Sequence, residues 1–286
     1  MFVIMGATGH VGRAVADTLL SHGEEVLILT RKPNEAEHWS DKGASIAEAD
    51  AEDGASLRAA FQRGKRAFLL NPPADPTGDT SATERRTISS ILSALDGLAL
   101  EKVVAASTYG AQPGEGFGDL ATLWQLEEGL RSQPIPAAIN RGAYYMTNWL
   151  GMVDAVKASG NLPSMFPADV EIPMVAPVDL GKAAADRLLS SPDDVGVRYV
   201  EGPTRYTPED VAAAFAVVLS RDVGVQVAPR EQWVSIYKGL GFSDEAAGSY
   251  AGMTGKSLDD DFDKPEQPER GTVTLQAFIS GVLSNK

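Results

Sequence analysis

A glycine-rich turn close to the start of the chain constrains the fold more than any other feature. A short apolar stretch, residues 2–5, runs directly into a segment with glycines at positions 6, 9 and 12. Val11, Val15 and Leu19 then recur at the spacing of one helix face. The pattern predicts a strand, a tight turn and a helix whose N-terminal amides point at an anion, typically the pyrophosphate of a dinucleotide.

Each glycine has its own task in such a turn. Gly6 can adopt a backbone conformation closed to other residues, Gly9 lets the pyrophosphate approach, and Gly12 lets the helix lie close to the sheet. An ordinary strand-to-helix turn is the alternative interpretation. The residues expected to contact the cofactor here are Gly6, Thr8, Gly9, His10, Val11 and Gly12.

The following elements alternate between short apolar strands and helices. Strands are expected at residues 25–30, 45–49, 66–70, 102–106 and 137–141, and helices at 10–22, 34–41, 54–63, 80–95 and 120–132. This alternation is typical of a parallel sheet with helices on both faces. The fold class is therefore α/β, a doubly wound Rossmann sheet.

The rhythm changes beyond Asn148, where prolines interrupt residues 162–178. The expected elements there are a strand at 172–178, a helix at 179–189, a strand at 197–201, a helix capped by Thr207 with Pro208 in its first turn, a strand at 225–228, and then short helices. We expect a Rossmann domain over residues 1–148, whose sheet later segments complete. A smaller α/β lobe on the substrate side, partly interleaved with it, would span residues 149–286.

Composition narrows the class of protein. No apolar run approaches the roughly 20 residues that a membrane span requires. We expect no signal peptide, because the first strand is expected to start at residue 2. The chain has no cysteine, and its three histidines all lie within the first 38 residues, so we expect no disulfide, no metal site and a cytoplasmic location. A net charge of −14 without a basic stripe opposes nucleic-acid binding.

The end of the second strand indicates which dinucleotide is bound. NAD enzymes commonly place an acidic residue there, whereas this chain has Thr30, Arg31 and Lys32. A guanidinium can grip a 2′-phosphate with two hydrogen bonds, which favours NADP(H), with Arg31 as the main contact and Lys32 or Thr30 assisting. A solvated pair of cations at the start of a loop is the alternative.

Three further pairs of residues follow the ends of later strands, at the edge where a cofactor lies in this topology. They are Asp50 with Ala51 near the adenine, Asn71 with Pro72 near the ribose and pyrophosphate, and Ala106 with Ser107 near the nicotinamide.

Three later segments carry a family resemblance. They are INRGAYYMTN at residues 139–148, VDLGKAAA at 178–185 and EGPTRYTPEDVA at 201–212. Together with the G-x-x-G-x-x-G spacing of the first turn, they resemble the NmrA-like atypical short-chain dehydrogenases/reductases. That family includes NADPH quinone oxidoreductases, triphenylmethane reductase and redox-sensing regulators.

The usual catalytic pair of that superfamily is missing. Ordinary members use Tyr-x-x-x-Lys, in which the lysine lowers the pKa of the tyrosine. None of the seven tyrosines here has a lysine four residues later, and residues 123–128 lack the lysine that isoflavone-reductase-like relatives carry in the matching helix. An epimerase or dehydratase is disfavoured because those relatives also need the pair.

Two functions remain open. The resemblance implies either direct hydride transfer from NADPH to a quinone-like or conjugated aromatic acceptor, or a regulator that binds NADP(H) without turnover. The partner is accordingly a small-molecule acceptor, and a homodimer or, for a regulator, a protein partner is left open.

No catalytic residue is assigned, but five residues are candidates for the acceptor pocket. Tyr109 follows the fifth strand, where the nicotinamide should lie, and the loop at 112–118 is a candidate lid. A core position for Tyr144 or Tyr145 and a plain surface turn for the loop are the alternatives. The pocket candidates are Tyr109, Phe117, Tyr144, Tyr145 and Asn148.

Overall fold

A parallel sheet of eight strands forms the centre of the molecule. The structure, a computed structural model, describes residues 1–259, 262 and 264–284. The strand order is β13-β10-β6-β5-β4-β1-β2-β3, and neighbouring strands pair in parallel. The strands are β1 (Phe2–Ile4), β2 (Val26–Thr30), β3 (Ser45–Glu48), β4 (Arg66–Leu69), β5 (Lys102–Thr108), β6 (Ala137–Gly142), β10 (Gly196–Glu201) and β13 (Glu269–Arg270).

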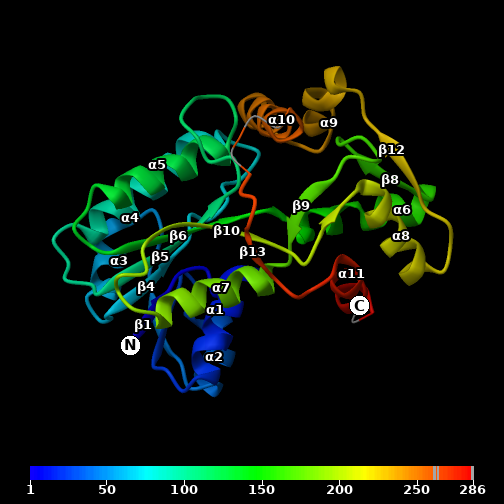
Figure 1. The fold of residues 1–286 in the computed structure, drawn as a ribbon. Coiled ribbons are helices and arrows are strands. Elements are labelled where there is room, and N and C mark those ends of the chain that lie inside the picture. Colours follow the sequence, from blue (N-terminus) through cyan, green and yellow to red (C-terminus); the bar gives the residue numbers. More distant parts are fainter. Residues whose placement is uncertain (260–261, 263, 285–286) are drawn as a thin grey trace.

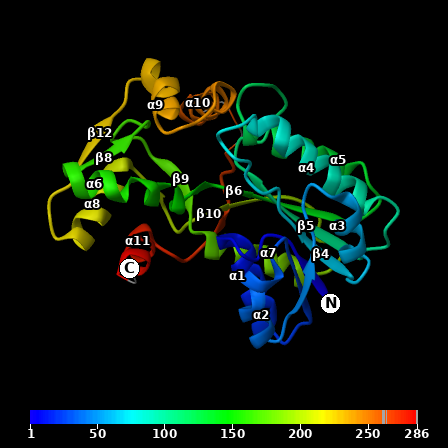
Figure 2. The same cartoon turned by 180° about the vertical axis from the view of Figure 1, so that it is seen from behind.

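Helices cover both faces of this sheet, as Figures 1 and 2 show from opposite sides. One face carries α1 (His10–Ser21), α2 (Glu37–Asp41) and α7 (Pro177–Leu189). The other carries α3 (Gly54–Phe61), α4 (Thr80–Leu95) and α5 (Asp119–Arg131). A separate apolar cluster fills each interface, which explains why central strands such as β2 are apolar at consecutive positions.

A smaller lobe with its own core lies beside the sheet (Figure 1). It has a three-stranded sheet, β11-β9-β7, and a two-stranded sheet, β12-β8. Its strands are β7 (Tyr144–Tyr145), β8 (Asn161–Ser164), β9 (Ile172–Val175), β11 (Arg205–Tyr206) and β12 (Gly224–Val227). The remaining helices are η1 (Pro33–Ala36), η2 (Met146–Met152), α6 (Val153–Ser159), α8 (Pro208–Leu219), η3 (Arg230–Gln232), α9 (Trp233–Gly239), α10 (Asp244–Leu258) and α11 (Leu275–Leu283).

The predicted fold class is confirmed, and the six strands expected in the sheet lie within two residues of their predicted ends. The Thr207 hydroxyl caps α8 by accepting from the Asp210 N–H, and the Asp210 carboxylate in turn accepts from the Thr207 N–H. The expected helix at 34–41 is instead a 3₁₀ turn that begins at Pro33, followed by the five residues of α2.

The expectation of only short helices after residue 228 was wrong. Helix α10 has fifteen residues, and β13 joins the central sheet beside β10. A two-residue strand such as β13 is too short to show a side-chain period, so its backbone pairing leaves no signal in the sequence.

The carboxyl ends of the parallel strands meet at one edge of the sheet, and this edge carries the candidate site. Within residues 1–259, 262 and 264–284, no helix has the length and apolar character needed to cross a bilayer. The same part of the chain contains no group of three or more acidic, histidine or cysteine residues that could hold a metal ion.

Candidate cofactor and acceptor site

The glycine turn packs so tightly that side chains do not fit at two of its positions. Gly6 has φ = +68°, and a Cβ atom there would lie 2.5 Å from Cδ2 of Leu70. A Cβ atom on Gly12 would lie 2.3 Å from the carbonyl oxygen of Gly6 and 2.7 Å from that of Met5. Helix α1 can lie against the end of β1 because these residues lack side chains, while Thr8 between them is exposed.

The N-terminus of α1 has unused backbone donors. Gly9 is the N-cap and offers no side-chain acceptor, and the first bond of the helix runs from the Arg13 N–H to the Gly9 carbonyl at 3.2 Å. Within the described residues, the N–H groups of His10, Val11 and Gly12 have no acceptor. Such amides and the helix dipole favour an anion, so the pyrophosphate of a dinucleotide fits this cradle.

Asn71 supplies an unused acceptor at the same edge. Its Oδ1 atom is buried and has no hydrogen-bond partner in the described part of the chain. Leaving a buried acceptor unpaired costs about 1–3 kcal/mol, which a hydroxyl donor on a ligand would offset. A ribose hydroxyl is such a donor, and Leu70, the preceding residue, contacts the glycine turn. Pro72, the next residue, is half-buried.

The two cations at the end of β2 differ in their surroundings. Lys32 Nζ lies 2.8 Å from Glu35, and the Lys32 N–H donates to Thr30 Oγ1 at 3.1 Å. Arg31 is exposed and has no hydrogen bond or ion pair with any described residue. Arg31 is therefore the cation that remains available for a ligand.

The residues after β3 form an ordered turn. The Asp50 N–H donates to Ser56 Oγ at 3.1 Å, and Asp50 Oδ1 accepts from the Glu52 N–H at 3.0 Å. Asp50 and Ala51 are half-buried beside the sheet edge. Their contact with adenine stays a prediction.

A residue at the end of β5 hydrogen-bonds to a buried ion pair. Ala106 and Ser107 are buried, and the Ser107 hydroxyl donates to Glu127 Oε1 at 2.6 Å. Arg141 donates to both oxygens of Glu127, at 2.9 and 2.8 Å. The Ser107 hydroxyl is thus engaged in the protein, and its place beside the nicotinamide stays a prediction.

Tyr109, one residue beyond β5, also hydrogen-bonds to a buried carboxylate that pairs with arginine. Its hydroxyl donates to Glu201 Oε1 at 3.1 Å, and Glu201 also pairs with Arg205 and Arg270. Burial, and then the negative charge of Glu201, raise the pKa of Tyr109 well above its usual range. Glu201 lies in one of the three family-like segments, but no local sequence pattern predicts its contact with Tyr109.

The structure separates the two neighbouring tyrosines. Tyr144 packs its ring against Trp149 and Phe166, with ring centroids 5.8 and 5.6 Å away, in the small lobe. Its hydroxyl hydrogen-bonds to the exposed Asn148. Tyr145 packs instead against the core beneath α1 and α7, which also contains Tyr109. A core role for the Tyr144 ring thus agrees with the alternative interpretation.

Phe117 lies back on its own loop. A Cβ atom on Gly114 would lie 2.2 Å from the tip of the Phe117 ring, so this glycine makes room for the aromatic ring. The ammonium group of Lys256, on α10, lies 5.4 Å from the ring centroid. In this arrangement the loop packs against α10, and a swing over an acceptor stays a prediction.

The N-terminal half of the chain matches a known family. Residues 6–132, which include the glycine turn, Arg31 and Asn71, match the family described as NAD(P)H-binding. These residues form an NAD(P)H-binding domain. The predicted dinucleotide cofactor is therefore confirmed at the level of NAD(P)H.

Two curated relatives of the chain are reductases. One is the (4-alkanoyl-5-oxo-2,5-dihydrofuran-3-yl)methyl phosphate reductase of Streptomyces griseus, 26% identical over 236 residues, which cover 80% of this chain and 79% of the relative. The other is quinone oxidoreductase 2 of Escherichia coli, 24% identical over 251 residues, which cover 86% and 84%. Both support NAD(P)H-dependent oxidoreduction.

Solved structures share the fold of the whole chain. The triphenylmethane reductase of Citrobacter sp., solved with NADP(H), has a TM-score of 0.77 at 18% identity, covering 98% of this chain and 95% of its own. NmrA, a negative transcriptional regulator solved with NAD, has a TM-score of 0.68 at 15% identity, covering 99% and 95%. These neighbours share the fold of the chain, in agreement with the predicted resemblance to the NmrA-like atypical short-chain dehydrogenases/reductases.

The NAD(P)H-binding domain also contains a buried pair of carboxyl groups that was not predicted from the sequence. Glu84 on α4 and Asp119 on α5 share a hydrogen bond, and the Thr122 hydroxyl donates to Glu84 Oε2 at 2.9 Å. Burial, and then the charge of Asp119, raise the pKa of Glu84 to about 8, and burial also raises the pKa of Asp119. The two residues lie on separate helices, so no local motif announces them.

This pair makes stability depend on pH. Below the usual pKa of 4.5, Glu84 is protonated in both the folded and the unfolded chain. Between that pH and about 8 only the unfolded chain releases the proton, so the contribution of Glu84 to folding is lost as pH rises. We expect the Tm of Glu84→Gln to decrease less than that of the wild type between pH 5 and 8.5. The two decreases should differ by about 3 °C or more, since ~1 kcal/mol corresponds to roughly 2–4 °C.

Thermal unfolding followed by circular dichroism checks this. Glu115→Gln is the matched control, because Glu115 is an exposed carboxylate four residues from Asp119. It should keep the wild-type pH dependence. An unchanged pH dependence in Glu84→Gln would mean that Glu84 is ionised in the folded protein.

Proposed function

We propose that the chain is an NADPH-dependent reductase that transfers a hydride directly to a quinone-like or conjugated aromatic acceptor. The observation that carries this is the row of amides without acceptors at the N-terminus of α1, with the unpaired Arg31 at the end of β2, within the described residues. Together they offer donors for a pyrophosphate and for one more phosphate.

The protein groups then have separate binding roles. The amides of His10, Val11 and Gly12 hold the pyrophosphate, Asn71 Oδ1 accepts from a ribose hydroxyl, and Arg31 holds the 2′-phosphate. When bound, the reduced nicotinamide supplies the hydride. A quinone acceptor that gains this hydride and one proton from water becomes a hydroquinone, so electrons and protons balance.

The side chains at the end of β5 fit a reaction without a dedicated acid. The hydroxyls of Ser107 and Tyr109 already donate to Glu127 and Glu201. An electron-poor acceptor stabilises the added electrons itself, so positioning supplies most of the acceleration. The names of the two curated relatives, a quinone oxidoreductase and a reductase of an unsaturated lactone phosphate, agree with a conjugated acceptor.

A regulator that binds NADP(H) without turnover is the second candidate. The same engaged hydroxyls favour it, because they give a substrate no free hydroxyl donor from Ser107 or Tyr109. The NmrA neighbour is described as a negative transcriptional regulator. Under this candidate, a pull-down recovers a protein partner whose binding depends on the ratio of NADP⁺ to NADPH.

Turnover decides between the two. We expect the purified protein to oxidise NADPH, followed at 340 nm, in the presence of benzoquinones or naphthoquinones at a rate on the order of 1 s⁻¹ or faster. Each acceptor is run beside a reaction without enzyme, because quinones also react slowly with NADPH in solution. Saturable NADPH binding by calorimetry, with no oxidation across the panel, would refute the reductase and leave the regulator.

A further inference from the structure

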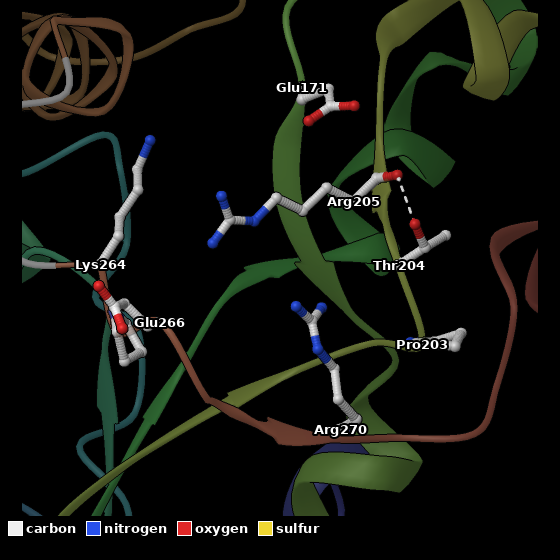
Figure 3. Close-up of a pocket in the computed structure, with 8 residues that line it drawn as sticks. Glu171, Pro203, Thr204, Arg205, Lys264, Glu266 and Arg270 are labelled. Atoms are coloured by element: carbon white, nitrogen blue, oxygen red, sulfur yellow. Dashed lines mark hydrogen bonds between the residues drawn. The ribbon is translucent and has the colours of Figure 1, made fainter.

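An open cavity lies beyond the candidate site, at the carboxyl ends of β10 and β13. It has a volume of about 630 Å³, within the range of small-molecule sites. Figure 3 shows Arg205 and Arg270 extending into it from one side, with Lys264 on the other. Glu171 and Glu266 also contribute to its lining.

A single side chain, that of Glu201, connects the cavity to Tyr109 at the end of β5. Glu201 is fully buried and accepts the Tyr109 hydroxyl at 3.1 Å. The same carboxylate accepts from Arg205, at 3.0 and 3.3 Å, and from Arg270, at 2.8 Å. Glu201 therefore lies between Tyr109, where the acceptor is expected, and the two arginines.

The two guanidinium groups carry more charge than Glu201 requires. One arginine suffices to neutralise one buried carboxylate, and here two share it. Arg205 binds it through Nε and Nη2, and Arg270 uses Nη1 for Glu201 and the Gly202 carbonyl. Among the described residues, Arg205 Nη1 and Arg270 Nε and Nη2 have no acceptor.

The acidic residues of the cavity leave these donors unused. Glu171 and Glu266 are exposed, and within the described residues neither forms an ion pair with Arg205 or Arg270. The two arginine side chains are 31% and 42% exposed, so a ligand can reach them while their donors are partly shielded from water. Guanidinium groups in this state bind carboxylate and phosphate oxygens strongly.

We propose that this cavity holds an anionic oxygen group, a carboxylate or a phosphate, carried by the acceptor that the protein reduces. The proposal rests on the reductase function for the ring that is reduced, but the anion site itself is built by Arg205 and Arg270. The acceptor places its conjugated ring near Tyr109 and its anionic end between the two guanidinium groups. The cavity then selects charged acceptors over neutral ones of the same ring.

Matched acceptors test this. The probes are 1,4-naphthoquinone, the same ring with a propionate side chain, and the same ring with a methyl phosphate. We expect KM for at least one anionic probe to be about tenfold or more below that of the neutral ring. Arg270→Gln should raise that KM about tenfold more than it raises the KM of the neutral ring. A purely structural role would change the values for all three probes by a similar factor.

Two further variants serve as a control and as a second test of the anion site. Arg198→Gln removes an arginine on β10, the strand that carries Glu201. Arg198 pairs with Asp194 at 2.8 Å and does not line the cavity, so this variant should leave all three KM values unchanged. Arg205→Lys keeps the charge next to Glu201 and should give a smaller rise in KM for the anionic probes. It serves as the test variant if Arg270→Gln unfolds at a lower temperature than the wild type.

The outcomes separate this proposal from the reductase function. If no probe is reduced, the reductase function fails, and calorimetry of the three probes still decides the cavity. Tighter binding of either anionic probe than of the neutral ring, weakened in Arg270→Gln, supports the anion site whichever anion is preferred. Equal affinity for neutral and anionic probes, or wild-type affinity in both cavity variants, overturns it.

Discussion

Arg31→Asp should weaken NADPH binding by about 2–3 kcal/mol, roughly 30–150-fold, and leave NADH binding nearly unchanged. Arg31 is exposed at the end of β2 with no partner among the described residues, so its guanidinium is free to bind a 2′-phosphate. An aspartate at the same place would repel that phosphate. NADH has only a ribose hydroxyl there, which a carboxylate can accept from.

Calorimetric titration of both nucleotides into both proteins measures this change of preference. Arg63→Asp is the matched control, because Arg63 is also exposed but precedes β4, at the opposite edge of the sheet. It changes the net charge by the same amount and should affect neither nucleotide. The difference for Arg31→Asp should shrink at high salt, since an exposed contact is screened. Equal losses for NADPH and NADH would show that Arg31 does not contact the 2′-phosphate.

Local sequence patterns predicted the helices and strands in which apolar residues recur at regular spacing. The apolar strands of the sheet and the amphipathic helices between them lie close to where the sequence placed them, because their burial repeats along the chain. The glycine turn was also readable, since only glycine fits at positions 6 and 12. By contrast, β13 consists of two residues paired through their backbones, and no side-chain pattern could reveal it.

The site was less predictable because its polar contacts join distant parts of the chain. Arg270 is 69 residues from its partner Glu201, and no local spacing connects them. The opposite placement of Tyr144 and Tyr145 could have been foreseen, since neighbouring residues of a strand point to opposite faces. The sequence alone could not show that Lys32 pairs with Glu35 while Arg31 stays available for a ligand.

Two glycine variants should separate nucleotide binding from folding. A Cβ atom on Gly9 would be 3.4 Å from its nearest neighbour, the Gly6 carbonyl oxygen, and Gly9 has φ = −94°, which suits any residue. Gly9→Ala should therefore keep the wild-type Tm. Its added methyl group stands at the amides expected to bind pyrophosphate, so affinity for NADPH and NADH should fall about tenfold together, the scale of one lost polar contact.

Gly12→Ala should instead act on the fold itself. Its Cβ atom would meet the Gly6 carbonyl oxygen at 2.3 Å and the Met5 carbonyl oxygen at 2.7 Å, both of them backbone atoms that cannot rotate away. Such overpacking costs about 1–3 kcal/mol, which lowers Tm by roughly 2–12 °C without any nucleotide present. Differential scanning calorimetry with and without NADPH distinguishes the two variants. If Gly9→Ala bound both nucleotides as tightly as the wild type, the pyrophosphate would not lie on the N-terminus of α1.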